Sequence, residues 1–238
     1  MVLTNVIVAV VLSIVVAYLI GSVSSSIIFT KQFDHKDIRS MGSGNAGMTN
    51  VLRSAGLKPG LLTIFCDFGK GVLSCLLGSV IFSGIATGHV ELAVLGYGSE
   101  TARYGAYIAG AACVIGHMYP LYFGFRGGKG VLTTAAVLLM IYPPLIAVDF
   151  SIFLVIAFLT KYVSLGSVIA AGTFPLWGWM FNYFKLYRSG TVSLQYMVIT
   201  TLILCFVSAF IVGRHHENIG RLIHGTEKKF TLHHDGGK

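Results

Sequence analysis

The residues best suited to chemistry lie in a glycine-rich segment, residues 42–53, with the sequence GSGNAGMTNVLR. Glycine lets backbone N–H groups converge on an anion, because it has no side chain and adopts conformations that other residues avoid. Hydroxyl, amide and guanidinium side chains add donors and positive charge. The candidates of this kind are Ser43, Asn45, Thr49, Asn50 and Arg53. The segment predicts a phosphate site, although a polar loop with an asparagine helix cap would contain similar residues.

A second glycine-rich segment, FRGGKG at residues 125–130, presents Lys129 directly after Gly127 and Gly128. It is not a nucleotide-binding P-loop, because valine follows its last glycine where the P-loop pattern requires serine or threonine. The structural alternative is a glycine turn whose basic residues anchor it at a membrane surface. As a functional segment, it would bring one lysine to a phosphate.

A third segment, KYVSLGS at residues 161–167, contains Ser164 and Ser167. Their spacing of three residues places both hydroxyls on one face of a helical turn. Serines in membrane helices commonly bond to a carbonyl of the preceding turn instead. This segment alone does not show which serine would contact a ligand.

The fourth segment, RHHENIGR at residues 214–221, brings His215, Asn218 and Arg221 toward one side of a helix. This arrangement predicts a polar, titratable face. A zinc site is not indicated, because the histidines are adjacent and only one acidic residue is near them. The alternative is a basic segment that contacts lipid headgroups.

The elements that position these segments must be membrane helices. Of the 238 residues, 55% are hydrophobic and only 11% are charged, and the mean hydropathy is +0.78. A soluble domain of this size needs more surface charge, whereas a bilayer requires backbone groups to bond within helices. We therefore predict an all-α, polytopic integral membrane protein forming a single domain over residues 1–238. The net charge of +8 comes from residues between apolar segments, which favours anionic lipid or substrate over nucleic acid.

Charge-free runs long enough to span a bilayer predict five helices, and the second of these should begin near Leu61. The runs are residues 1–30, 71–90, 104–125, 162–184 and 189–213. Residues 131–160 are also apolar but are interrupted by Pro143 and Pro144. If the prolines form a hairpin turn between two short helices, the total is about seven spans.

Charge counting supports this hairpin and sets the orientation. With residues 129 and 161 on one side, that side has thirteen of the seventeen lysines and arginines. The positive-inside rule then places these loops in the cytoplasm, with the N-terminus outside. A short cytoplasmic tail follows from about residue 214. All four segments therefore face the cytoplasm.

Three further polar residues, Asp67, Lys70 and His117, fall within predicted spans. Such residues are costly in lipid and should face the bundle interior or its cytoplasmic edge. Asp67 and Lys70 lie one turn apart and can pair. We interpret all three as supports of the site, with a structural role favoured over a catalytic one for His117.

Taken in order, the four segments and GHMYP at residues 116–120 resemble the bacterial acyl-phosphate-dependent glycerol-3-phosphate acyltransferases, the PlsY family. The resemblance covers residues 21 to about 230. It implies a helical enzyme of the bacterial inner membrane. Such an enzyme moves a fatty acyl group from acyl phosphate to the sn-1 hydroxyl of glycerol 3-phosphate, giving lysophosphatidic acid and phosphate. Two departures from the family pattern are Met48, where alanine is usual, and His216, where arginine is common.

The resemblance also implies which residues act, and it implies no cofactor or metal. Ser43, Lys129 and His215 are the expected catalytic residues. The expected substrate-binding residues are Asn45, Thr49, Asn50, Arg53, Gly127, Gly128, Ser164, Ser167 and Asn218. The small-molecule partners would be glycerol 3-phosphate and acyl phosphate, within a lipid bilayer. Neither the oligomeric state nor the preferred acyl chain follows from the sequence.

The sequence leaves the proton acceptor open. An acyl phosphate is already activated, so direct attack by the glycerol hydroxyl is the simplest route. The general base could be His215, whose ordinary pKa is near 6.5, or the phosphate of the second substrate, whose second pKa is about 6. An acyl-enzyme on Ser43 is a third option, without an evident triad to support it.

The main alternative is a transporter for a phosphorylated anion, which would also use glycines and cationic groups. Transporters place such groups near the membrane midplane, between repeated halves. Here the groups cluster at one predicted surface, and no internal repeat is evident. The acyltransferase interpretation is therefore preferred.

Overall fold

Long apolar helices form most of the chain, as the composition predicts. The computed structural model describes residues 2–229. The longer helices are α1 (Val2–Gly21), α4 (Leu57–Thr87), α5 (Glu100–Met118), α6 (Val131–Ile141), α7 (Pro143–Thr160), α8 (Val163–Phe181) and α9 (Leu194–Arg214). Within the described residues the only β structure is an isolated bridge between Val94 and Tyr97, so the all-α prediction is confirmed.

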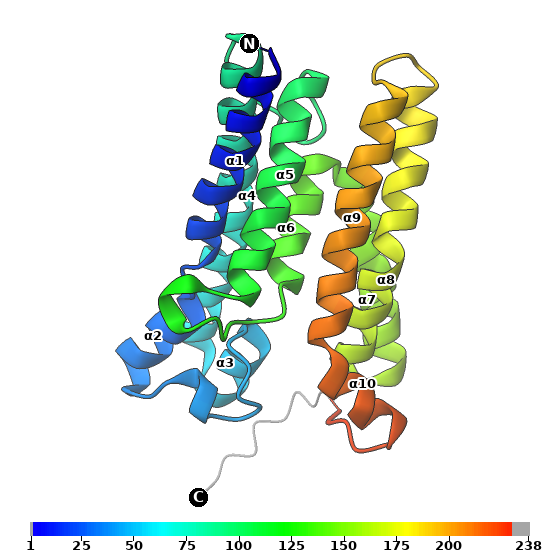
Figure 1. Ribbon diagram of the computed structural model, residues 1–238. Helices are drawn as coiled ribbons and strands as arrows, with labels where there is room; N and C mark the ends of the chain where they lie inside the picture. Colours follow the sequence, from blue (N-terminus) through cyan, green and yellow to red (C-terminus); the bar gives the residue numbers. More distant parts are fainter. Residues whose placement is uncertain (1, 230–238) are drawn as a thin grey trace, which may run out of the picture.

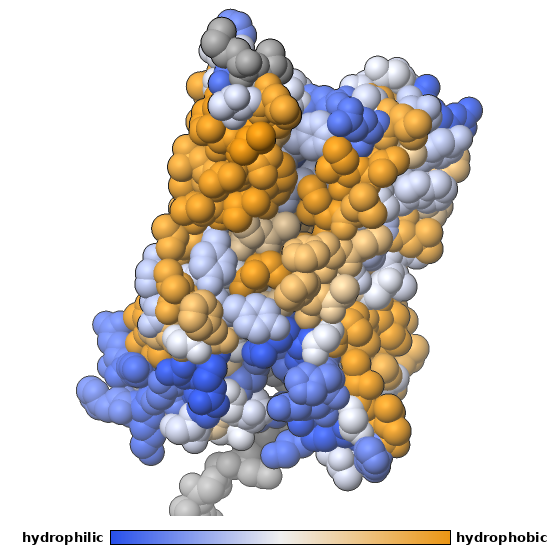
Figure 2. Space-filling view, viewed as in Figure 1, coloured by the Kyte–Doolittle hydropathy of each residue, from blue (hydrophilic) through white to orange (hydrophobic). Residues whose placement is uncertain are grey.

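Shorter elements gather at one end of the bundle, at the bottom of Figure 1. They are α2 (Ser25–Asp34), a 3₁₀ turn η1 (Ile38–Ser40), α3 (Met48–Ser54), a second 3₁₀ turn η2 (Leu121–Phe123) and α10 (His216–Ile223). A π-helical segment η3 (Asn182–Tyr187) continues α8 at the opposite end. Figure 2 shows hydrophilic residues concentrated at the end with α2, α3 and α10, below a broad apolar surface.

Helices α1, α4, α5 and α6 form a first group, and small residues let its members approach closely. A Cβ atom at Gly78 of α4 would lie 2.4 Å from the carbonyl oxygen of Gly105 on α5. A Cβ at Gly21 of α1 would lie 2.2 Å from the carbonyl oxygen of Cys113, also on α5. Helices in lipid gain stability mainly from such close backbone packing, because lipid tails are as apolar as leucine. These contacts fix α1 and α4 against α5.

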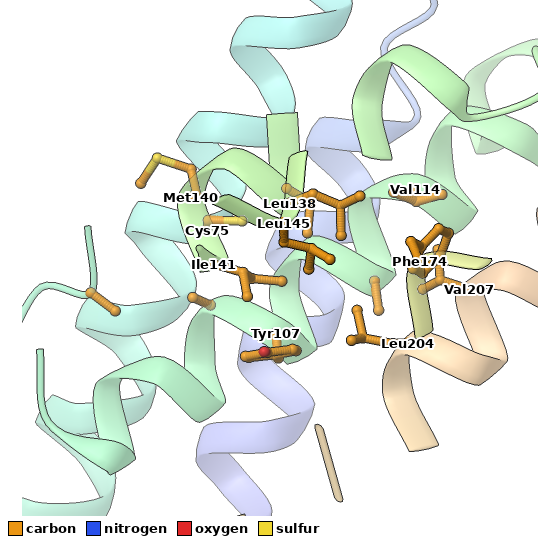
Figure 3. Packing of buried hydrophobic residues seen from close by; sticks show 14 of the residues in the cluster. Cys75, Tyr107, Val114, Leu138, Met140, Ile141, Leu145, Phe174, Leu204 and Val207 are labelled. Carbon is orange, nitrogen blue, oxygen red and sulfur yellow. The ribbon is translucent and has the colours of Figure 1, made fainter. Parts of the chain in front are cut away.

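The second group, α7 to α9, joins the first through buried apolar side chains (Figure 3). Val114 of α5, Leu138 of α6, Leu145 of α7, Phe174 of α8 and Leu204 of α9 are each at most 2% exposed. Close packing of this kind is sensitive to changes of even one methylene group. The apolar cluster therefore sets the distance between the two groups, and with it the distance between the segments at their ends.

The apolar stretch 131–160 is broken as predicted. Helix α6 ends at Ile141, and α7 begins with Pro143 and Pro144, where the missing N–H of proline costs no helical hydrogen bond. The residues just before α6 and just after α7 both reach the C-terminal segment. Lys129 bonds to Asn218, and Ser164, near the start of α8, bonds to Glu227. Lys129 and Ser164 therefore lie at one end of the molecule.

Helix α6 is too short to cross a bilayer. Its 11 residues extend roughly 16 Å, about half of the hydrocarbon thickness. The loop after α4 meets its end, where the N–H of Gly96 donates to the carbonyl of Met140 at 3.0 Å. Among residues 2–229, six helical stretches are long and apolar enough to span. Of the seven longer helices, α6 is the one that falls below the length needed to span.

The spans also differ from prediction at two boundaries. The first run is divided near residues 22–24 into α1 and α2, so its polar end turns away as a separate helix. Helix α4 begins at Leu57 instead of near Leu61. Its first turn accommodates Pro59, since the N–H groups of a first turn have no helical acceptor.

Candidate active site

The loop between η1 and α3, residues 41–47, is organised around the side chain of Asn50. Its Oδ1 accepts hydrogen bonds from the N–H of Ser43 at 3.0 Å and from Ser54 Oγ at 3.3 Å. Its Nδ2 donates to the carbonyls of Met41 and Asn45, both at 3.0 Å. Asn50 was predicted to bind substrate. Its polar atoms shape the loop, so a contribution to binding would come through the loop conformation, and the binding role stays a prediction.

The neighbouring polar side chains of this segment are not engaged in this way. Ser43 and Arg53 are exposed, and Asn45 and Thr49 are partly buried. Within residues 2–229 none of these four side chains makes a hydrogen bond. They are therefore available to a bound anion, and their assignment to the site stays a prediction.

The turn at residues 124–130 is held against the end of α5. The N–H groups of Gly127 and Gly128 donate to the carbonyls of Met118 and His117, at 3.1 and 3.2 Å. Arg214 Nη2 donates to the carbonyl of Gly127 at 3.2 Å. The backbone N–H groups of the two glycines are thus used inside the protein. Their assignment as substrate-binding residues stays a prediction, and it cannot rest on these N–H groups.

Gly128 lies where no other residue fits. A Cβ atom there would lie 2.2 Å from His117 Nε2 and 2.8 Å from the carbonyl oxygen of Ala46. Real Cβ atoms essentially never approach other heavy atoms below 3.0 Å. The absent side chain therefore lets the turn pack directly on the loop of the first segment. This contact joins the first and second segments.

Lys129 connects the turn to the fourth segment through a hydrogen bond from Nζ to Asn218 Oδ1. Burial lowers the pKa of Lys129 to about 8, and the nearby positive charge of Arg221 acts in the same direction. Helix α6 starts two residues later, and the first N–H groups of a helix lack helical acceptors. A lysine beside a helix N-terminus is a suitable arrangement for phosphate.

Glu227 links the third segment to the fourth, and sequence reasoning did not single it out. Its carboxylate accepts from Ser164 Oγ at 2.6 Å, Asn218 Nδ2 at 2.6 Å and Arg221 Nε at 2.7 Å. Burial alone would raise its pKa, but these hydrogen bonds, from Ser164 first, lower it overall. A possible signal was its position as the one carboxylate in the basic stretch from residue 218 to residue 229.

The two serines of the third segment have different partners. Ser164 bonds to Glu227, whereas Ser167 donates to the carbonyl of Val163 in its own helix at 3.0 Å. Ser167 thus follows the structural alternative for a serine in a membrane helix. Ser164 is the serine at the junction with the fourth segment.

His215 is buried, and its tautomer follows from its partner. Nδ1 lies 2.8 Å from the carbonyl oxygen of Ile211, which can only accept, so Nδ1 carries the proton and Nε2 has the free lone pair. Burial lowers the pKa of His215 to about 4, and the charge of Lys129 contributes. The imidazole is therefore neutral at physiological pH. It can accept a hydrogen bond but is a weak proton acceptor.

Comparison with known proteins gives a consistent result. A family model described as glycerol-3-phosphate acyltransferase matches residues 11–225. The glycerol-3-phosphate acyltransferase of Clostridioides difficile (strain 630) is 37% identical over 215 residues, which cover 90% of this chain and 92% of that protein. That of Shouchella clausii is 37% identical over 229 residues, 96% of this chain and 99% of that protein.

Solved structures agree with the sequence comparisons. The crystal structure of PlsY, an integral membrane glycerol 3-phosphate acyltransferase, in its glycerol 3-phosphate form matches this fold with a TM-score of 0.72 and 33% identity. That match covers 93% of this chain and 96% of the other. The lysophosphatidic acid form of PlsY matches with a TM-score of 0.69 and 32% identity, over 93% and 95% of the two chains. This chain is a member of the glycerol-3-phosphate acyltransferase family.

Proposed function

We propose that this protein transfers a fatty acyl group from acyl phosphate to the sn-1 hydroxyl of glycerol 3-phosphate, giving lysophosphatidic acid and phosphate. One observation carries the proposal. Lys129 and Asn218 meet beside the loop of Ser43 at one end of an apolar helical bundle. A phosphorylated head can bind there while an acyl chain remains in lipid. The relatives named above are glycerol-3-phosphate acyltransferases.

The reaction needs no nucleophile from the protein. The glycerol hydroxyl attacks the acyl carbonyl carbon, a new C–O ester bond forms, and the C–O bond to phosphate breaks. Phosphate leaves readily once Lys129 and Arg53 offset its charge. The hydroxyl proton leaves to a phosphate group. Ser43 has an exposed side chain in the loop that Gly128 packs against, and in this scheme its hydroxyl donates a hydrogen bond instead of forming an acyl-enzyme.

We assign the role of proton acceptor to the substrate's own phosphate. The pKa of His215, lowered to about 4, leaves it a poor base at neutral pH, whereas a phosphate monoester has a second pKa of about 6. The Nε2 lone pair of His215 can still accept a hydrogen bond from the glycerol hydroxyl and orient it. His215 is therefore a binding and orienting residue in this scheme.

The variant His215→Gln should raise the KM for glycerol 3-phosphate more than it lowers kcat. Glutamine retains hydrogen bonding but cannot take up a proton near neutral pH. Steady-state kinetics with glycerol 3-phosphate as the varied substrate would measure both constants. His216→Gln, at the exposed neighbouring histidine, is the matched control and should leave them unchanged. A loss of about 10²–10⁴ confined to kcat would instead identify His215 as the general base.

The kcat/KM for glycerol 3-phosphate should be highest between about pH 6 and pH 8. Below about pH 6 the substrate phosphate gains a proton. Above the pKa of Lys129, which is about 8, that lysine loses its charge and binds phosphate less well. The variant Lys129→Arg remains charged in this range, so its profile should lack the alkaline decrease even if its maximum is lower. An alkaline decrease of unchanged midpoint in that variant would assign it to another group.

The activity itself can be tested with purified protein, radiolabelled glycerol 3-phosphate and acyl phosphate in lipid vesicles. We expect labelled lysophosphatidic acid that forms only when acyl phosphate is present. Label that accumulates inside the vesicles without conversion would support the transporter instead. Acyl-CoA offered in place of acyl phosphate separates the proposed donor from a thioester donor, since only acyl phosphate should give product.

We further propose that the site faces the cytoplasm of a bacterial inner membrane, because the basic loops gather at that end. Single cysteines at Ser43 and Lys161, in a chain whose four native cysteines are replaced, should react with an impermeant thiol reagent from the cytoplasmic side. A cysteine at Lys185 should react from the outside. All three positions are exposed. Labelling of the Lys161 position from outside would contradict the orientation.

A further inference from the structure

A buried cluster of polar side chains lies next to the Lys129 turn, where α2, α4 and α5 meet. Its members are Ser25, Asp67, Lys70 and His117, each at most 8% exposed. Ser25 Oγ donates to Asp67 Oδ1 at 2.7 Å, and Lys70 Nζ lies 2.8 Å from the same oxygen. The predicted pairing of Asp67 with Lys70 is confirmed. Unpaired charges would be costly at such depth, so the pair explains how two charged residues are tolerated.

The hydrogen bonds of Lys70 determine the tautomer of His117. Nζ lies 2.8 Å from Asp67 Oδ1, 2.9 Å from the carbonyl oxygen of Val23 and 3.0 Å from His117 Nδ1. An ammonium group has three hydrogens and no lone pair, so it donates to all three atoms. Nδ1 of His117 must therefore be the acceptor. Its distance of 3.6 Å from Asp67 is too long for a competing hydrogen bond. The remaining proton is on Nε2.

The Nε2 edge of His117 faces the Lys129 turn. A Cβ atom at Gly128 would lie 2.2 Å from Nε2, so the backbone of this glycine lies against this edge and any larger residue would displace it. The turn is fixed to the same residue, since the N–H of Gly128 donates to the carbonyl of His117. No residue between 2 and 229 accepts a hydrogen bond from Nε2. The Nε2–H of His117 is thus a hydrogen-bond donor without a partner, and it lies against Gly128, the residue before Lys129.

We propose that His117 donates its Nε2–H to a phosphate oxygen of a bound substrate, and that Lys70 and Asp67 are positioning residues that fix this tautomer. This inference rests on the proposed function and assigns a further residue to its phosphate site. The charges of Asp67 and Lys70 cancel, so His117 adds a donor without adding a cation beside Lys129 and Arg214. A phosphate held in part by neutral donors leaves more readily after transfer than one held only by cations.

The tautomer can be observed directly by nitrogen NMR of detergent-solubilised protein with ¹⁵N-labelled histidine. The variant His117→Gln identifies the signals of His117 by their disappearance. We expect a protonated Nε2 and an unprotonated Nδ1, and we expect the Nε2 signal to move when glycerol 3-phosphate or inorganic phosphate is added. A proton on Nδ1, or a signal that neither ligand moves, would overturn the proposal.

Kinetics separate binding from a purely structural role. His117→Phe, which removes the donor, should raise the KM for one phosphorylated substrate by about 10- to 100-fold, as expected for a lost hydrogen bond to a charged group. His117→Gln should recover part of this loss. Which KM rises, that for glycerol 3-phosphate or that for acyl phosphate, identifies the phosphate involved. His89→Phe, at an exposed loop histidine, is the control. Unchanged KM values in folded His117→Phe would refute the proposal.

The positioning residues need a variant that does not leave a buried charge unpaired. Lys70→Met alone would leave the carboxylate of Asp67 buried without its charged partner, which destabilises the fold and can prevent folding. The double variant Asp67→Asn with Lys70→Met removes both charges together. We expect it to lose the single tautomer of His117 in the NMR spectrum and to raise the same KM as His117→Phe. A double variant that keeps the Nε2–H tautomer and a wild-type KM would remove Lys70 and Asp67 from this role.

The experiments distinguish failure of the proposed acyltransferase activity from failure of the proposed role of His117. If the wild-type protein makes no lysophosphatidic acid from acyl phosphate, the proposed function is wrong. If it makes this product while the His117 signals and KM values behave as in the contradicting outcomes above, only the role of His117 is wrong.

Discussion

Replacing Lys129 with alanine should lower kcat/KM by about 10²–10³ while the protein remains folded. Lys129 donates to Asn218, is partly buried and lies at the start of α6, where a phosphate would bind. Loss of one group that stabilises developing charge in a dry site has an effect of this size. Alanine fits helix starts and turns well enough that the fold should survive. The measurement is steady-state kinetics on protein whose folding is checked by thermal unfolding.

Arg126 supplies a matched control for this variant. It is a basic residue three positions earlier in the same turn, but it is exposed. Arg126→Ala should change kcat/KM little at moderate ionic strength, because exposed charges are screened by salt. Equal losses in both variants would mean that the turn attracts anions only through its overall charge. Near wild-type kcat/KM in Lys129→Ala would exclude Lys129 from the site.

Replacing Gly128 with alanine should also impair the enzyme, for a steric reason. The added methyl group would lie 2.2 Å from His117 Nε2 and 2.8 Å from the backbone oxygen of Ala46. The backbone oxygen cannot rotate away, so the turn must move off the loop of Ser43. We expect a rise of about 10-fold or more in the KM for glycerol 3-phosphate, since a displacement near 1 Å can cost about 10² in rate. The comparison of KM for both substrates is the readout.

Gly172→Ala is the control for this second variant. A Cβ at Gly172 of α8 meets nothing within 4 Å. Alanine is favoured over glycine within a helix by up to about 1 kcal/mol, so this variant should keep its activity and be slightly more stable. A Gly128→Ala protein with both KM values unchanged would show that the turn and the loop need not touch.

The sequence predicted the fold well because lipid imposes simple rules. Length and apolar composition indicate spanning helices, and the prolines at 143 and 144 indicate the break between α6 and α7. The prolines also predict that α6 is short, but the sequence does not show what meets its end. The N–H of Gly96, in a loop far away in the sequence, donates to the carbonyl of Met140 at the end of α6. Composition gives no information on such a contact.

The site was predicted less completely, for a related reason. Residue types identified Lys129 and Asn218, which do meet, but types alone do not show which polar groups are already used inside the protein. Asn50 has the same chemistry as Asn45, and only the folded loop shows that Asn50 is engaged by its neighbours. Glu227 was overlooked because no spacing pattern marks an isolated carboxylate in a basic stretch.

The hydrogen bonds that join Asn218 and Glu227 to Ser164 and Lys129 also bear on how the protein is made. Residues 218 and 227 leave the ribosome after all the membrane helices. Before that moment Lys129 and Ser164 lack these partners, so a nascent chain cannot yet hold the assembled site. A protein whose synthesis stops soon after α9 would be inserted in the membrane but inactive. Activity thus begins only after the whole bundle has been translated.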